Sequence, residues 1–112
     1  MPLVPDFQVD TQSGQGAARI RLEGELDLAA VPTFEDHLRR VEADRPETIV
    51  LDLSELTFMD SSGLRAIVLA DERARAHRRR LAIVPGPPPV RRVFEITQLD
   101  QRLELVDDPS AV

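Results

Sequence analysis

The chain has 112 residues, of which 42% are hydrophobic and 30% charged, and its formal net charge is -6. This size predicts one globular domain, and the acidic excess disfavours direct binding of nucleic acid, whose phosphates require positive charge. The lack of cysteine excludes disulfides, thiol nucleophiles and thiolate metal sites. The longest apolar run, residues 66–70, is too short to span a membrane, and the N-terminus lacks a secretory leader, so we expect a cytoplasmic protein.

The N-terminal half predicts a hairpin, a helix and a buried strand. Residues 7–11 and 18–24 alternate apolar and polar side chains around the turn residues 12–16, which is typical of a half-exposed β-hairpin. Apolar residues at helical spacing, with a proline in the first turn, predict a helix over about 30–44. The β-branched and apolar run 48–53 then predicts a buried strand.

The C-terminal half repeats the alternation of helix and strand. Helical spacing predicts a helix over about 62–76, and an apolar run predicts a short strand at 81–84. A proline-rich connector, 86–89, leads into a helix that Pro89 can start and whose apolar side extends toward Leu99. Residues 103–106 predict the last strand.

The resulting order, β-β-α-β-α-β-α-β, predicts an α/β fold with a mixed, mostly parallel sheet flanked by helices. We expect a single domain over residues 1–112, with its core at about 7–106. Residues 1–6 contain two prolines and are expected to fray, and residues 107–112 form a short polar tail.

Three short polar residues lie between the strand at 48–53 and the following helix. Asp60, Ser61 and Ser62 are all good N-cap residues, because a short side-chain oxygen can accept a hydrogen bond from a free amide of the first turn. A helix N-terminus also tolerates a phosphate well, since its free amides and its dipole both favour negative charge. The residues alone leave a purely structural and a functional interpretation open.

An acidic loop, residues 23–27, follows the second strand of the hairpin. The carboxyl ends of neighbouring parallel strands lie at the same edge of a sheet, so we expect Glu25 and Asp27 to lie near Asp60 and Ser61. Asp27 could instead serve only as the cap of its own helix.

Other chemistries have weaker support. A serine hydrolase would need a Gly-x-Ser-x-Gly turn, which is absent, and a histidine base, but His37 and His77 fall in polar stretches of predicted helices. The carboxylates follow no metal-binding pattern, so we expect no metal site. The arginine-rich segment 73–80 is either a solvated helix end or a phosphate-binding face.

Three motifs together carry a family resemblance. The sequences LEGELD (22–27), IVLDL (49–53) and FMDSSGL (58–64) occur in an order and at a spacing that resemble the bacterial anti-sigma factor antagonists, small proteins of the STAS domain class. The resemblance covers about residues 7–106 and includes the helix after Pro89. The chain departs from relatives at Gln98, where glycine is common, and in a tail too short for the closing helix that many members have.

The resemblance implies a phosphorylation switch. In this family the first serine after the aspartate, here Ser61, is phosphorylated by a partner that is both an anti-sigma factor and a serine kinase. The unphosphorylated protein binds that partner and releases the sigma factor, phosphorylation weakens binding, and a serine phosphatase restores it. The expected contact surface comprises Glu25, Asp27, Asp60, Ser61, Ser62 and Gly63.

The resemblance thus implies a regulatory binding protein and not an enzyme, with no catalytic residue and no cofactor. We expect a monomer when it is free, with no direct contact with nucleic acid or membrane. STAS domains also occur in transporters and in stress-sensing assemblies. The alternative is therefore a non-phosphorylated adaptor subunit of such an assembly.

Overall fold

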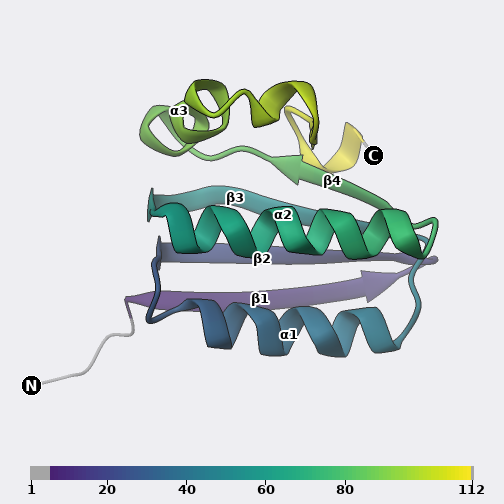
Figure 1. The fold of residues 1–112 in the computed structure, drawn as a ribbon. Coiled ribbons are helices and arrows are strands. Elements are labelled where there is room, and N and C mark those ends of the chain that lie inside the picture. Colours follow the sequence, from purple (N-terminus) through teal and green to yellow (C-terminus); the bar gives the residue numbers. More distant parts are fainter. Residues whose placement is uncertain (1–5, 112) are drawn as a thin grey trace, which may run out of the picture.

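The computed structural model describes residues 6–111. Most of the elements belong to one sheet and the helices around it (Figure 1). In chain order the elements are β1 (Phe7–Gly14), β2 (Ala17–Leu26), α1 (Val31–Ala43), β3 (Thr48–Met59), α2 (Ser61–Ala76), β4 (Arg80–Val84), α3 (Pro88–Ile96), the 3-10 turn η1 (Leu99–Gln101), β5 (Glu104–Leu105) and the 3-10 turn η2 (Pro109–Ala111).

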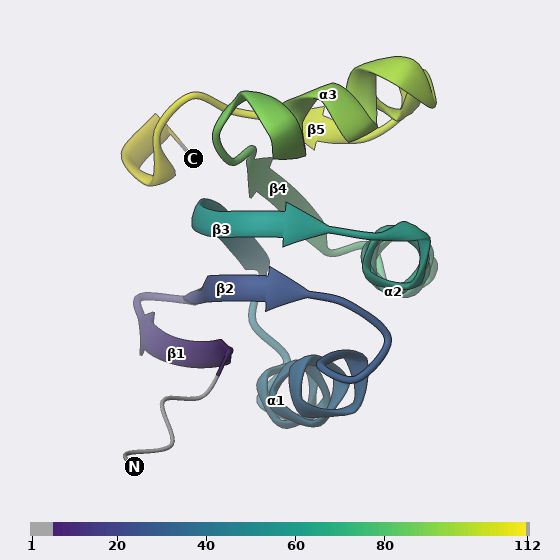
Figure 2. The ribbon, with the colours of Figure 1, turned by 90° about the vertical axis from the view of Figure 1, so that its left-hand side faces the viewer.

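The five strands lie in the order β1-β2-β3-β4-β5. β1 pairs with β2 in antiparallel fashion, and each later pair is parallel. Figure 2 shows α1 and α2 side by side on one face of the sheet, while α3 lies at its β4–β5 end. The predicted element order and the mixed, mostly parallel sheet are confirmed.

The core forms where the strands meet the buried sides of the helices. Leu51 and Leu53 on one side of β3 and Val50 and Asp52 on the other are all buried, as expected for a central strand that is covered on both faces. The buried side of α2 consists largely of small residues such as Ala66 and Ala70, which let the helix approach the sheet closely. A single hydrophobic cluster connects these strands and helices.

Two strands are longer than the sequence pattern predicts. β2 continues to Leu26, so Glu25 lies in a strand, and the prediction of an acidic loop at 23–27 is wrong for all but its last residue. β3 continues to Met59, because Glu55, Leu56, Phe58 and Met59 still pair with β2 across two register shifts. Such irregularities in the ladder break the alternation of side chains on which strand prediction depends.

The ends of the chain also differ from prediction. The helix expected from Pro89 begins at Pro88 and stops at Ile96, and Leu99 lies in the separate turn η1. The last strand has only two residues, and η2 occupies part of the predicted tail. The expected fraying concerns residues outside the described range, except Asp6, whose carbonyl accepts a 2.8 Å hydrogen bond from the Glu25 amide.

Candidate functional site

The candidate site lies where β2 and β3 end side by side. Leu26 pairs with Met59 in the parallel ladder, so Asp27 and Asp60 each follow directly after neighbouring strand ends. The β2–α1 turn and the start of α2 therefore share one edge of the sheet (Figure 2). This is the edge at which ligands and partners meet many open α/β sheets.

Asp60 joins the two segments. It is the N-cap of α2, and its Oδ1 accepts a 3.0 Å hydrogen bond from the Gly63 amide. Its Oδ2 accepts a 3.2 Å bond from the Leu28 amide in the β2–α1 turn, and its own amide donates to the Leu26 carbonyl at 3.3 Å. The half-buried carboxylate therefore ties the start of α2 to the turn that carries Asp27.

Gly63 lets the first turn of α2 press against the end of β2. A Cβ atom built at this position would lie 2.5 Å from the Leu26 carbonyl oxygen and 2.7 Å from Leu26 Cγ. Real side chains do not approach so closely, so any larger residue would push the helix away from the strand. Gly63 itself is buried, and it acts at the site through packing.

Ser61 and Ser62 occupy the first two positions of α2, one residue earlier than the predicted helix start. Ser61 is exposed and Ser62 is half-buried. Asp60 caps the third amide of the helix, so the dipole and the two preceding amides remain directed at the surface where Ser61 lies. A negative group on the Ser61 hydroxyl would be stabilised there.

The two remaining predicted residues take different positions at the same edge. The Asp27 carboxylate accepts a 3.0 Å hydrogen bond from the Ala30 amide and so shapes the turn before α1. It does not cap the helix, because the N-cap position is Ala30. Glu25 is exposed near the end of β2, opposite Phe58.

Sequence reasoning missed the apolar part of this surface. Leu28 is 71% exposed in the β2–α1 turn, and Phe58 is 47% exposed beside the end of β2. Exposed large apolar side chains beside functional polar groups often mark a protein interface. The available signal was Leu28 itself, since this leucine falls between the predicted strand and the predicted helix and belongs to the apolar side of neither.

Residues 6–111 contain no cluster of three or more metal-binding side chains. His77 lies at the C-terminal end of α2, opposite to Ser61, and the half-buried His37 lies within α1. None of the hydrogen bonds in this part of the chain joins a histidine to Ser61 or Ser62. None of the described helices has the length and hydrophobicity needed to cross a bilayer.

Several known proteins match this chain over most of its length. The anti-sigma-F factor antagonist RsfB of Mycobacterium tuberculosis is 29% identical over 102 residues, which are 90% of this chain and 83% of RsfB. The crystal structure of an anti-sigma factor antagonist from Mycobacterium paratuberculosis has a TM-score of 0.88 at 27% identity, covering 96% of this chain and 92% of that one.

A third match is a modified protein. The Bacillus cell fate determinant SpoIIAA, solved in its phosphorylated form, has a TM-score of 0.70 at 26% identity. The match covers 94% of this chain and 95% of the SpoIIAA chain. The family model described as STAS domain matches residues 8–110. With this match, the five-stranded mixed sheet and the capped serine turn at one edge, the chain belongs to the STAS domain family.

Proposed function

We propose that this protein is an anti-sigma factor antagonist controlled by phosphorylation of Ser61. Unphosphorylated, it binds an anti-sigma factor that is also a serine kinase, and the sigma factor is released. The observation that carries the proposal is the exposed Ser61 hydroxyl at the start of α2, beside a carboxylate that ties in the β2–α1 turn. The names of RsfB and of the Mycobacterium paratuberculosis relative support the activity, and phosphorylated SpoIIAA supports the modification.

The chemistry of transfer requires little from this chain. Phosphoryl transfer needs an in-line approach of the serine oxygen, and the kinase supplies the nucleotide, the metal and any base. An exposed hydroxyl in the first turn of a helix can make that approach without rearrangement of the core. The protein thus acts as a substrate and binding partner, and we propose no catalytic residue, no metal and no cofactor of its own.

The switch follows from charge at a binding surface. A phosphoserine adds about -1.5 to -2 charge near pH 7, next to Asp60 and Asp27. The start of α2 stabilises that charge by about 0.3–1 kcal/mol, so the fold tolerates it. A partner that rebinds must strip water from the dianion, and a loss of about 3 kcal/mol corresponds to roughly a hundredfold weaker affinity. A serine phosphatase would reverse the change.

The unphosphorylated surface offers complementary parts for docking. Leu28 and Phe58 supply apolar contact area, while Glu25, Asp27, Asp60 and the first turn of α2 supply the polar rim. Because the partner regulates transcription, we place the protein in the cytoplasm. The negative net charge fits a protein partner better than nucleic acid, and we propose a monomer when it is free.

Phosphorylation by the kinase tests the proposal. Incubation with the cognate kinase and ATP should add one phosphate, detected by mass spectrometry of the intact protein. Ser61→Ala should abolish the label, and Ser62→Ala is the matched control that should retain it. A label that persists on Ser61→Ala would remove the assignment of Ser61.

The alternative is a non-phosphorylated adaptor subunit of a stress-sensing or transport assembly. It predicts stable co-purification with its partners that is insensitive to Ser61→Asp. The switch predicts that Ser61→Asp weakens binding to the kinase while leaving the circular dichroism spectrum unchanged. Affinity measured for wild type and Ser61→Asp by calorimetry therefore distinguishes the two.

A further inference from the structure

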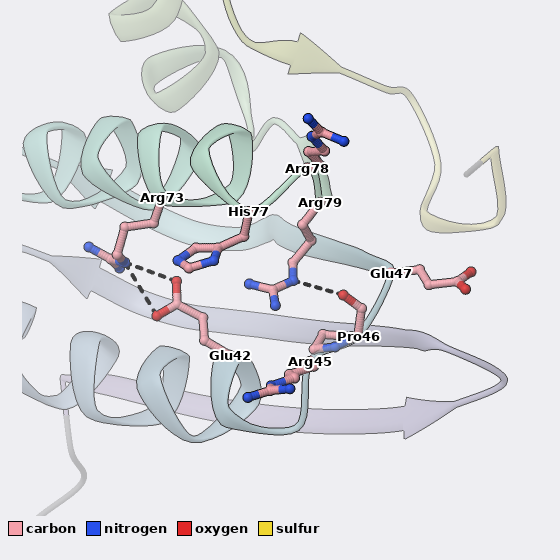
Figure 3. Close-up of a pocket in the computed structure, with 8 residues that line it drawn as sticks. All are labelled: Glu42, Arg45, Pro46, Glu47, Arg73, His77, Arg78 and Arg79. Atoms are coloured by element: carbon pink, nitrogen blue, oxygen red, sulfur yellow. Dashed lines mark hydrogen bonds and ion pairs between the residues drawn. The ribbon is translucent and has the colours of Figure 1, made fainter.

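A second concave surface lies between the C-terminal ends of α1 and α2 (Figure 3). Its volume is about 500 Å³, within the usual range for sites of small molecules. It lies at the far end of α2 from Ser61, a separation of roughly 24 Å for 16 residues at about 1.5 Å each. The cavity is therefore separate from the surface of the proposed switch.

The cavity is strongly basic. Its lining contains four arginines and His77 against two carboxylates. One of these, Glu42, is already bound by Arg73, whose Nε lies 3.0 Å from Oε2. The other, Glu47, points away from the cavity in Figure 3 and lies beside Gly16. The unpaired charge that faces the cavity is therefore positive, which favours an anionic ligand.

Two of the guanidinium groups are held in place through their Nε atoms. Arg73 Nε donates to Glu42, and Arg79 Nε donates a 2.7 Å hydrogen bond to the Pro46 carbonyl. Both side chains project into the space between the helices in Figure 3. Among the described residues, Arg73 Nη2 is buried without a hydrogen-bond partner. Because that atom is out of contact with solvent, the donors that can reach a phosphoryl oxygen are the remaining ones of these two fixed guanidinium groups.

The other two arginines occupy positions that usually favour glycine. Arg45 and Arg78 follow the C-caps of α1 and α2, with positive φ angles of 51° and 55°. The Arg79 amide donates to the Ala74 carbonyl, and the Arg78 amide donates to Arg75, so backbone amides already satisfy this helix end. Arginine is thus not needed there as a cap, and its left-handed conformation is unfavourable.

From this geometry we propose that the cavity binds a small anion that carries two or more phosphoryl groups. Arg73 and Arg79 would bind its oxygens in the interior, with His77 beside them. Arg45 and Arg78 at the rim would add positive charge near the outer phosphoryl group, Arg78 at longer range because its side chain points away from Arg79 and His77 in Figure 3. The functional interpretation of the arginine-rich segment 73–80 is the one that the fold favours, because α1 brings Glu42, Arg45 and Pro46 opposite it.

Titration with sodium tripolyphosphate at constant ionic strength tests the proposal, followed by calorimetry and by amide chemical shifts. We expect saturable binding with one ligand per chain and shifts confined to residues 42–47 and 73–80. The double variant Arg45→Gly with Arg78→Gly should weaken binding by roughly tenfold or more. Arg79→Gln should weaken it further, with its fold verified by circular dichroism. Adenosine triphosphate in a parallel titration shows whether a nucleoside adds affinity.

Two controls separate site binding from general electrostatics. Arg65→Gln with Arg92→Gln removes two exposed positive charges elsewhere. Gln15→Gly with Gln98→Gly replaces the other two non-glycine residues that have positive φ within residues 6–111. Both should retain wild-type affinity. Equal weakening in the charge control, shifts spread over the surface, non-saturable heat or no binding at millimolar concentration would each overturn the proposal. None of these outcomes depends on phosphorylation of Ser61.

Discussion

At the scale of single residues, Gly63 sets how α2 meets β2. In Gly63→Ala the new methyl group would meet the Leu26 carbonyl at 2.5 Å, so we expect a loss of about 1–3 kcal/mol in the free energy of unfolding. Gly14→Ala is the matched control, because no atom lies within 4 Å of a Cβ there and its stability should change little. Urea denaturation of both variants checks this. Equal stabilities would show that α2 can shift at no cost.

Leu28 provides a test of the docking surface that does not involve phosphorylation. Its side chain is 71% exposed, so Leu28→Ser should leave stability within about 0.5 kcal/mol of wild type. If the turn docks the anti-sigma factor, affinity should fall roughly 10- to 100-fold, as for an apolar interface anchor. Ile96→Ser at the end of α3 removes a comparably exposed residue, at 74%, and should not change affinity. Calorimetric titration of the partner measures both.

The sequence predicted some roles of these residues and missed others. The short polar side chains at 60–62 were enough to predict a capped helix, since capping is local, and the structure shows that Asp60 is the cap. The second oxygen of Asp60 binds the Leu28 amide 32 residues away, and no local pattern reports that contact. The exposure of Leu28 is likewise a tertiary property. Local capping was thus predictable, whereas the joining of two segments required the structure.

At the scale of elements, the end of α2 has an arginine where glycine is preferred. Arg78→Gly should stabilise the protein by about 1 kcal/mol, because glycine adopts the positive φ of 55° without steric cost. Glycine placed two residues earlier, in Ala76→Gly, replaces the last residue of the helix and should destabilise by less than about 1 kcal/mol. Thermal unfolding of both variants shows whether each substitution raises or lowers stability relative to wild type. Destabilisation by Arg78→Gly would show that its side-chain contacts outweigh the backbone cost.

The types of the elements could be predicted, but several of their ends could not. α1 matches its prediction closely because its apolar spacing is regular and a proline marks its start. β3 continues past Leu53 although Ser54 and Glu55 are exposed, because its backbone still pairs with β2. The pattern of apolar and polar side chains indicates which residues are buried. A strand segment that pairs through its backbone but stays exposed therefore cannot be recognised from that pattern.

At the scale of the whole molecule, a buried carboxylate links stability to pH. Asp52 is 1% exposed; burial alone would raise its pKa, but hydrogen bonds from Ser54 and Arg19 outweigh this effect and hold the pKa below its ordinary value. The unfolded chain therefore binds this proton more readily than the folded one. Stability from this group is fully present above about pH 5 and is lost as pH falls through about 4 and below.

Asp52→Asn tests this link. We expect a loss of about 1–3 kcal/mol near neutral pH, because charged hydrogen bonds disappear, and a shallower decline of stability in acid. Asp10→Asn, at an exposed position on β1, removes the same charge and should retain the wild-type acid profile. Urea midpoints measured across the acid range compare the three proteins. If the urea midpoint of Asp52→Asn fell with pH as steeply as that of wild type, the acid sensitivity would come from other carboxylates.

The bridge made by the Asp60 carboxylate has a consequence for how the two forms would be recognised. One Asp60 carboxylate oxygen accepts from the Gly63 amide and the other from the Leu28 amide. The shape of the surface around Ser61 is therefore fixed before any partner binds. The kinase and the phosphatase would then bind the same rigid surface. Its electrostatic potential would differ between the unphosphorylated and phosphorylated forms, and its shape would not. Amide spectra of the two forms should superimpose except beside this edge of the sheet.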